Sequence, residues 1–126
     1  MRTEILLTLS ILSLLCLTGL GEVSTIEYLL TKGAEEYVNG SLKEAFRSFD
    51  NATTIDPENA TVWFARGMAL SGLKRYEEAI SSYNKSIQID DKNAYVWYAR
   101  ATDEGYIGRM NDSLASYDQS LQIDPE

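Results

Sequence analysis

The chain has 126 residues, of which 44% are hydrophobic and 24% charged, and its formal charge at pH 7 is −8. This length predicts one small domain, and so acidic a composition argues against binding to nucleic acids or to anionic membrane surfaces, which require a basic face. Histidine is absent and Cys16 is the single cysteine, which excludes an intramolecular disulfide and a Cys/His zinc site.

Residues 1–21 have the composition of a targeting segment. A short start with Arg2 is followed by an uncharged, leucine-rich stretch over residues 5–20 and by small residues around Gly21. This order is typical of a secretory signal peptide cleaved after Gly21. Two alternatives stay open: an uncleaved anchor, although the stretch is shorter than the roughly 20 residues that span a bilayer, or a buried helix of the fold. We therefore expect residues 22–126 to form an extracytoplasmic domain, secreted or at the cell surface, or anchored by residues 5–20.

The remainder of the chain is an internal repeat with a constant period. Residues 60–92 and 94–126 align without a gap at twelve identical pairs, among them Trp63 with Trp97. A further step back by the same interval reaches residues 26–59, so the sequence predicts three units, at 26–59, 60–93 and 94–126.

Each unit is predicted to contain two helices. In the second unit, apolar residues at helical spacing run from Val62 to Leu70, a breaker follows at Ser71–Gly72, and a second helical pattern runs from Tyr76 to Ile87. The same order of helix, breaker and helix applies to the units on either side.

Residues that start or stop helices support these boundaries. Proline at 57 and 125 ends the second helices of units one and three, and Asn59 and Asn93 are expected to cap the helices that follow. Ser41 with Glu44 has the pattern of a capping box. At the proline position of unit two stands Asp91, which predicts a less sharply enforced turn.

This pattern resembles the tetratricopeptide repeat. That family places a large residue, a small one four positions later, then an alanine, an aromatic, a second small residue and a proline at fixed positions. The matching residues are, in unit order, Leu29, Trp63 and Trp97; Gly33, Gly67 and Ala101; Ala45, Ala79 and Ser113; Phe49, Tyr83 and Tyr117; Ala52, Ser86 and Ser120; Pro57, Asp91 and Pro125. The resemblance covers residues 26–126. It implies an all-α, right-handed superhelical solenoid of three antiparallel helix hairpins, packed through small residues that admit bulky neighbours.

The resemblance also implies a concave groove, lined by the first helix of each unit, that binds a peptide or a protein partner. By position, the candidate partner-binding residues are Leu30, Phe64, Met68, Tyr95, Tyr98 and Thr102, with Tyr106 as a further candidate. The alternative for each aromatic residue is simple packing between helices. Glu27 and Glu35 at the rim would favour a basic partner.

Family members that grip a C-terminal carboxylate use lysine, arginine and asparagine in this groove. The corresponding residues here are Leu30, Ala34, Ala65, Tyr95 and Ala99. A carboxylate clamp is therefore not expected.

Catalysis is not expected either. Serine is plentiful, but no histidine is present to activate it. Neighbouring carboxylates such as Glu77 and Glu78 point about 100° apart on a helix and do not converge on one atom. No cofactor, metal ion or small-molecule substrate is predicted.

Five of the six asparagines stand in the pattern Asn-x-Ser/Thr, and these glycosylation candidates are Asn39, Asn51, Asn59, Asn84 and Asn111. Together with a signal peptide they indicate an exported glycoprotein. The alternative is a chance cluster of polar surface residues.

A second hypothesis for function is self-association. Solenoids normally end in a polar capping helix, and the sequence shows none after the third unit. We then expect partial exposure of Leu114, Tyr117 and Leu121. These residues would pack against a second copy of the chain and give a homo-oligomer.

Overall fold

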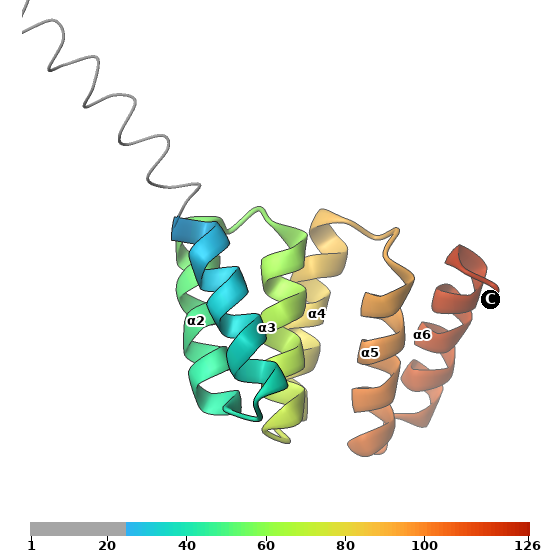
Figure 1. Ribbon diagram of the computed structural model, residues 1–126. Coiled ribbons are helices and arrows are strands. Elements are labelled where there is room, and N and C mark those ends of the chain that lie inside the picture. The colour runs from blue at the N-terminus through green and yellow to red at the C-terminus, as the bar shows by residue number, and fades with distance from the viewer. Residues whose placement is uncertain (1–24) are drawn as a thin grey trace, which may run out of the picture.

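The computed structural model describes residues 25–126, and this range is built from α-helices and turns without a β-strand. A helix over residues 25–38 is followed by α2 (Leu42–Ile55), α3 (Ala60–Gly72), α4 (Tyr76–Ile89), α5 (Ala94–Tyr106) and α6 (Met110–Ile123). Figure 1 shows α3, α4, α5 and α6 following one another across the molecule in chain order, with the 25–38 helix in front of α2. The signal or anchor predicted for residues 1–21 lies outside the described part of the chain. Over residues 25–126, no helix is long and apolar enough to cross a membrane.

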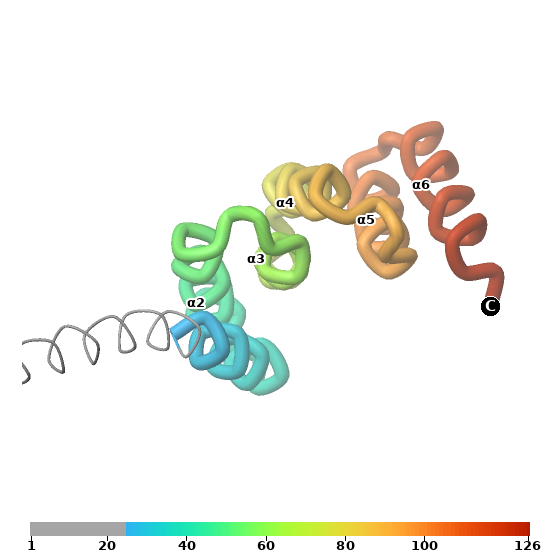
Figure 2. The backbone as a smooth tube through the Cα atoms, turned by 90° about the horizontal axis from the view of Figure 1, so that it is seen from above, coloured from blue at the N-terminus to red at the C-terminus, as the bar shows by residue number. Residues whose placement is uncertain are grey.

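The helices form a row of antiparallel hairpins. The 25–38 helix is followed by α2, while α3 packs against α4 and α5 against α6. Neighbouring hairpins meet where α2 packs on α3 and α4 on α5, and α3 also contacts α5 directly. Seen from above, in Figure 2, the hairpins follow one another as a stepped row rather than a closed bundle. The predicted all-α solenoid of three hairpins is confirmed.

The turn inside each hairpin recurs at equivalent positions of the three repeat units. The second residue after the first helix has a positive φ in every hairpin: 80° at Gly40, 61° at Lys74 and 81° at Gly108. The next amide donates back into the first helix, as from Arg75 to the Leu70 carbonyl at 2.9 Å. The breaker predicted at Ser71–Gly72 is therefore placed too early, because both residues belong to α3.

The helix caps separate into two classes. Asn59 and Asn93 cap α3 and α5 as predicted, each accepting from the amide two residues later at 3.1 Å. The capping box predicted at Ser41 is wrong, because its side chain makes no capping hydrogen bond. Ser41 enters α2 directly from the hairpin turn with ψ of 61°, whereas Asn59 is extended with ψ of 106°. Only the extended conformation aims the side chain at the first free amides.

A tryptophan side chain forms a hydrogen bond to the backbone of each loop between hairpins. Trp63 donates from Nε1 to the Pro57 carbonyl, and Trp97 donates in the same way to the Asp91 carbonyl, both at 2.8 Å. Asp91 thus takes the place of proline without loss of this bond, which fixes the entry to α5.

Close packing within the hairpins depends on glycine. A Cβ on Gly33 would lie 2.6 Å from a ring carbon of Phe49, and a Cβ on Gly67 would collide in the same way with the Tyr83 ring. Such distances are shorter than van der Waals contact, so the rings lie directly on the helix backbone.

The last hairpin has a more polar interior than the middle one. Glu104 stands where unit two has Leu70, and its side chain is buried. It is held by the Ser116 hydroxyl at 2.6 Å and by Arg100, with Nε 3.4 Å from Oε1. The carboxylate is thus paired and hydrogen-bonded, which is the condition for burying a charge.

Candidate functional site

A pocket of about 300 Å³ opens where the first helices of the hairpins come together. Its walls come from the 25–38 helix, α3, α4 and α5: Tyr37, Phe64, Met68, Ser71, Tyr83, Tyr95, Tyr98, Ala99, Thr102 and Asp103. We call this the groove pocket. It is mostly aromatic and contains residues from all three repeat units.

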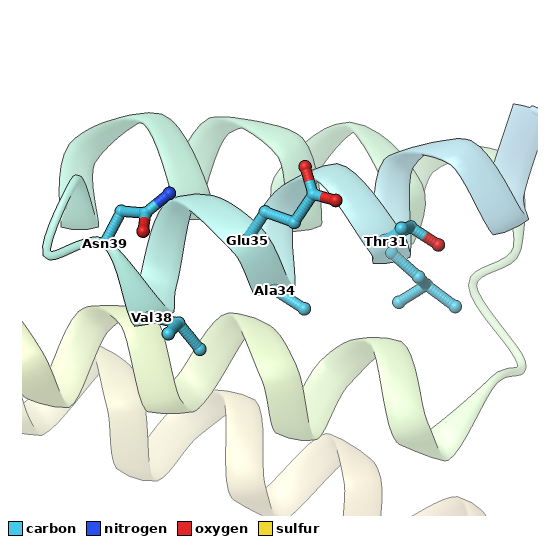
Figure 3. A pocket seen from close by; sticks show the side chains of 6 residues that line it. Thr31, Ala34, Glu35, Val38 and Asn39 are labelled. Atoms are coloured by element: carbon cyan, nitrogen blue, oxygen red, sulfur yellow. The ribbon is translucent and has the colours of Figure 1, made fainter.

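Five of the six predicted partner-binding residues meet in the groove pocket: Phe64, Met68, Tyr95, Tyr98 and Thr102. Leu30 does not. It lines a separate hollow of about 600 Å³ on the 25–38 helix, together with Thr31, Ala34, Glu35, Val38 and Asn39. Figure 3 shows Thr31, Ala34, Glu35, Val38 and Asn39 spread along that single helix.

The tyrosines of α5 differ in how they are held. Tyr98 meets the Tyr117 ring edge-on at 5.4 Å, and the Tyr117 hydroxyl lies 3.1 Å from Oγ1 of Thr102. Tyr95 is 72% exposed and Tyr98 57%, so both present aromatic surface to solvent. Tyr106 lies outside the groove pocket and stacks on Tyr76 at 4.9 Å.

Phe64 and Met68 have two roles. Both pack against the buried cluster that contains Leu70 and Tyr83, and both also line the groove pocket. The ring of Phe64 lies 6.0 Å from that of Tyr83. Packing between helices and exposure to the groove are therefore not exclusive at these positions.

Sequence reasoning missed Asp103, which is 1% exposed and lines the groove pocket. The Ser71 hydroxyl donates to Oδ1 at 2.7 Å, while Oδ2 is buried without a hydrogen-bond partner. Burial raises the pKa of Asp103 to about 6, and the bond from Ser71 opposes that rise. The repeat pattern contained a signal for the burial of Asp103, because Ala69, at the same position one repeat earlier, is fully buried.

The charge balance around the groove pocket is negative. Asp103 is the one charged side chain among the described residues that line it. The pKa of Tyr83 is raised by burial and, to a lesser extent, by the nearby Asp103 charge. The groove therefore offers a buried acidic group surrounded by aromatic rings, and no lysine or arginine of residues 25–126 lines it.

The predicted glycosylation candidates all lie at or near the surface. Asn39, Asn51, Asn84 and Asn111 are exposed, and Asn59 is partly buried. Asn59 uses its side-chain nitrogen to donate to Asp56 at 3.0 Å, while its oxygen caps α3. A glycan would replace one of the two hydrogens of that nitrogen, beside the bond to Asp56.

Comparisons with known proteins agree with the repeat pattern. Residues 60–93 match the tetratricopeptide repeat family. No curated protein matches the sequence.

Solved structures share the fold at low sequence identity. The TPR domain of Arabidopsis OM64 superposes with a TM-score of 0.80 and 23% identity, covering 82% of this chain and 86% of that one. The first TPR domain of Spaghetti (RPAP3), solved with the HSP90 peptide SRMEEVD, superposes with a TM-score of 0.80 and 19% identity, and the match covers 82% of each chain. The TPR2B domain of yeast Sti1 in a pHsp70 complex superposes with a TM-score of 0.78 and 23% identity, covering 80% of this chain and 81% of that one. Residues 60–93 therefore form a tetratricopeptide repeat, and the described residues share the fold of tetratricopeptide-repeat domains.

Proposed function

We propose that this protein is a non-catalytic scaffold that binds a peptide or protein partner in its concave groove. The observation that carries the proposal is the convergence of Phe64, Met68, Tyr95, Tyr98 and Thr102 on the groove pocket. Tyrosine and methionine are favoured at protein contacts because they bury a large area and tolerate water at one end. Support by analogy comes from the similar domains solved with an HSP90 peptide and with pHsp70.

The preferred partner is expected to differ from the peptide in the Spaghetti structure. That peptide, SRMEEVD, is acidic at its end. The positions of a carboxylate clamp here hold aliphatic residues and tyrosine, and the groove pocket carries Asp103. Repulsion of acidic segments and attraction of basic ones follow from this charge distribution.

The proposal includes an extracytoplasmic location, which rests on the composition of residues 1–21 and on the five sequons. Four of the sequon asparagines are exposed, as an acceptor must be. A shift in mass on treatment of the native protein with an N-glycosidase, together with loss of residues 1–21 from its N-terminus, would be the expected result. A native chain without glycans that still begins at Met1 would contradict this location.

The groove is tested by substituting its aromatic residues in the full chain. Tyr98→Ala and Phe64→Ala are expected to reduce capture of the native partner from its source by at least about tenfold, the usual effect of removing an aromatic anchor. The measurement is a pull-down with the captured protein quantified by mass spectrometry, with folding checked by circular dichroism.

Tyr106→Ala is the matched control. Tyr106 is on the same helix as Tyr98, is similarly exposed at 66%, and also contacts a second tyrosine, but it lies outside the groove pocket. Its substitution should leave capture unchanged. Equal capture by all three folded variants and the wild type would show that the groove is not the binding surface.

A second candidate function, self-association, is favoured by the bare face of α6. Met110, Leu114 and Leu121 are 60%, 63% and 57% exposed. One repeat earlier, Ile80 and Ile87 occupy the positions of Leu114 and Leu121 and are covered, because α5 packs on α4. Tyr117, also predicted to be bare, is partly buried against Tyr98.

Sedimentation or light scattering of the full chain tests this second function. If α6 mediates association, the wild type forms a defined oligomer and Leu114→Glu with Leu121→Glu returns it to the monomer, because charges cannot be buried unpaired at the contact. A wild-type monomer at high concentration would exclude the candidate. So would an oligomer that the substitutions leave unchanged.

A further inference from the structure

The buried carboxylate of Asp103 has one oxygen, Oδ2, without a hydrogen-bond partner. Its Oδ1 accepts from Ser71 at 2.7 Å, whereas Oδ2 receives no hydrogen bond from any described residue. Buried charges are normally paired, since an unpaired one is costly to remove from water. Glu104, the next residue along α5, follows that rule through Arg100 and Ser116.

The surroundings of Asp103 suit a positive charge from outside. The groove pocket that it lines has aromatic walls from three helices, among them Phe64 on α3, Tyr83 on α4 and Tyr95 on α5. Aromatic faces attract cations, most strongly where water is excluded. The pocket therefore combines a carboxylate with several ring faces and has no basic residue among its described lining side chains.

We propose that the groove pocket binds the side-chain ammonium group of a lysine from the partner, with Asp103 as its counter-ion and the aromatic residues as its walls. This inference rests on the groove being the partner-binding surface. It specifies the residue type of the partner that binds in the groove pocket and the groups of this chain that hold it.

An ammonium group fits better than a guanidinium group because Oδ2 is the one carboxylate oxygen without a hydrogen bond. Arginine binds carboxylates best through two parallel hydrogen bonds, which require both oxygens. Here Ser71 already donates to Oδ1, so one arm of a guanidinium fork would have to share that oxygen. The compact ammonium donates from one point and can use Oδ2 alone.

Occupation of the pocket requires a local movement, because Oδ2 is covered in the free protein. Among the wall residues, Tyr95 is the most exposed. The aliphatic part of a lysine side chain would then lie against Phe64 and Met68 as the ammonium reaches Asp103.

The test compares three capped pentapeptides: Gly-Ala-Lys-Ala-Gly and the same peptide with norleucine or arginine in place of lysine. They are titrated into the ¹⁵N-labelled full chain, and the amide shifts of Tyr98, Thr102 and Asp103 are followed. The lysine peptide is expected to shift these signals in a saturable way and the norleucine peptide is not. Equal binding of the lysine and norleucine peptides would overturn the proposal, as would tighter binding of the arginine peptide.

Two substitutions identify the groups involved. Asp103→Asn keeps the shape of the side chain and should weaken the lysine peptide at least about tenfold, as expected for loss of a charged hydrogen bond. Tyr37→Leu removes a ring face from the wall that the 25–38 helix contributes and should weaken it about two- to fivefold. The matched control is Asp118→Asn, which makes the same change of charge at an exposed residue of α6 and should change the affinity by less than about twofold.

A stability measurement separates this role from a structural one. Because the pKa of Asp103 is raised in the folded protein, folding favours the protonated form, and its contribution to stability is lost as pH rises through about 6. The other ionisable groups lining the pocket are Tyr37, Tyr83, Tyr95 and Tyr98, and α3 contributes the Ser71 hydroxyl. Asp103→Asn should therefore raise the thermal midpoint at pH 7.5 but not at pH 4, while weakening lysine binding at pH 7.5.

The outcomes distinguish this inference from the proposed function. Loss of partner capture in Tyr98→Ala but not in Asp103→Asn would leave the groove as the binding surface and refute the ammonium site. Capture that is insensitive to both variants would refute both. A destabilised Asp103→Asn variant at pH 7.5 would show that the carboxylate is a structural element of the fold.

Discussion

At the scale of single residues, Lys74 shows how far the repeat constrains the backbone. The hairpin turn requires a left-handed residue at the second position after the first helix, which is glycine at 40 and 108 but lysine at 74, with φ of 61°. A side chain in this conformation places Cβ close to the following carbonyl, at a cost of about 1–2 kcal/mol. The backbone hydrogen bonds on either side, including that from Arg75 to Leu70, hold Lys74 there.

Replacement of Lys74 by glycine is therefore expected to raise the free energy of unfolding by about 0.5–1 kcal/mol, since the relief of strain exceeds the added entropy of the unfolded chain. Chemical denaturation of the full chain measures the change. The reciprocal control is Gly108→Lys in the equivalent turn, which should lower stability by a similar amount. A destabilised Lys74→Gly would mean that the lysine side chain makes a contact that outweighs the backbone strain.

Single residues also mark where the sequence was informative and where it was not. Asn59 and Asn93 could be predicted as caps because each follows a loop and enters its helix in an extended conformation. Ser41 could not be rejected from its residue type, because the turn before α2 decides the backbone angle of the N-cap. The same limit applies to Asp103, whose unpaired oxygen depends on α3 and α5 packing together.

At the scale of elements, the hairpins depend on how closely two helix backbones approach. Small residues at fixed positions permit a ring to lie on the opposite backbone, as Tyr83 lies on Gly67. Gly33 and Gly67, which occupy the same position in the first helices of units one and two, both meet an aromatic ring. The resemblance predicted that these small residues admit bulky neighbours, and the structure identifies the neighbours as Phe49 and Tyr83.

Gly67→Ala is expected to lower the free energy of unfolding by about 1–3 kcal/mol, because the added methyl group overlaps the Tyr83 ring in a packed interior. Gly105→Ala is the control within the same class of helix, since a Cβ there meets only the Ser113 hydroxyl at 3.5 Å. It should be neutral or stabilising by up to about 1 kcal/mol from helix propensity. Equal effects of the two substitutions would refute the close packing of the second hairpin.

At the scale of the whole molecule, three hairpins bring side chains from distant parts of the sequence to the groove pocket. The repeat period and the resemblance to the tetratricopeptide repeat were sufficient to predict the solenoid, and five of the residues that the resemblance assigns to a groove line one pocket. The period and the resemblance were insufficient for Leu30, which lines a hollow of its own on the 25–38 helix. Repeat position determines which helix face a residue occupies, but the curvature of the stack determines which faces converge.

The central claim is that the partner contacts the concave groove. It is tested most directly by site-specific photo-crosslinking, with a photoreactive phenylalanine analogue placed at Tyr95 or at Tyr106 of the full chain in its native source. The two side chains are similarly exposed, at 72% and 66%, and belong to the same helix, but Tyr95 alone lines the groove pocket. We expect a covalent adduct with a partner protein from position 95 and none from position 106. An adduct from position 106 with none from position 95 would contradict the account.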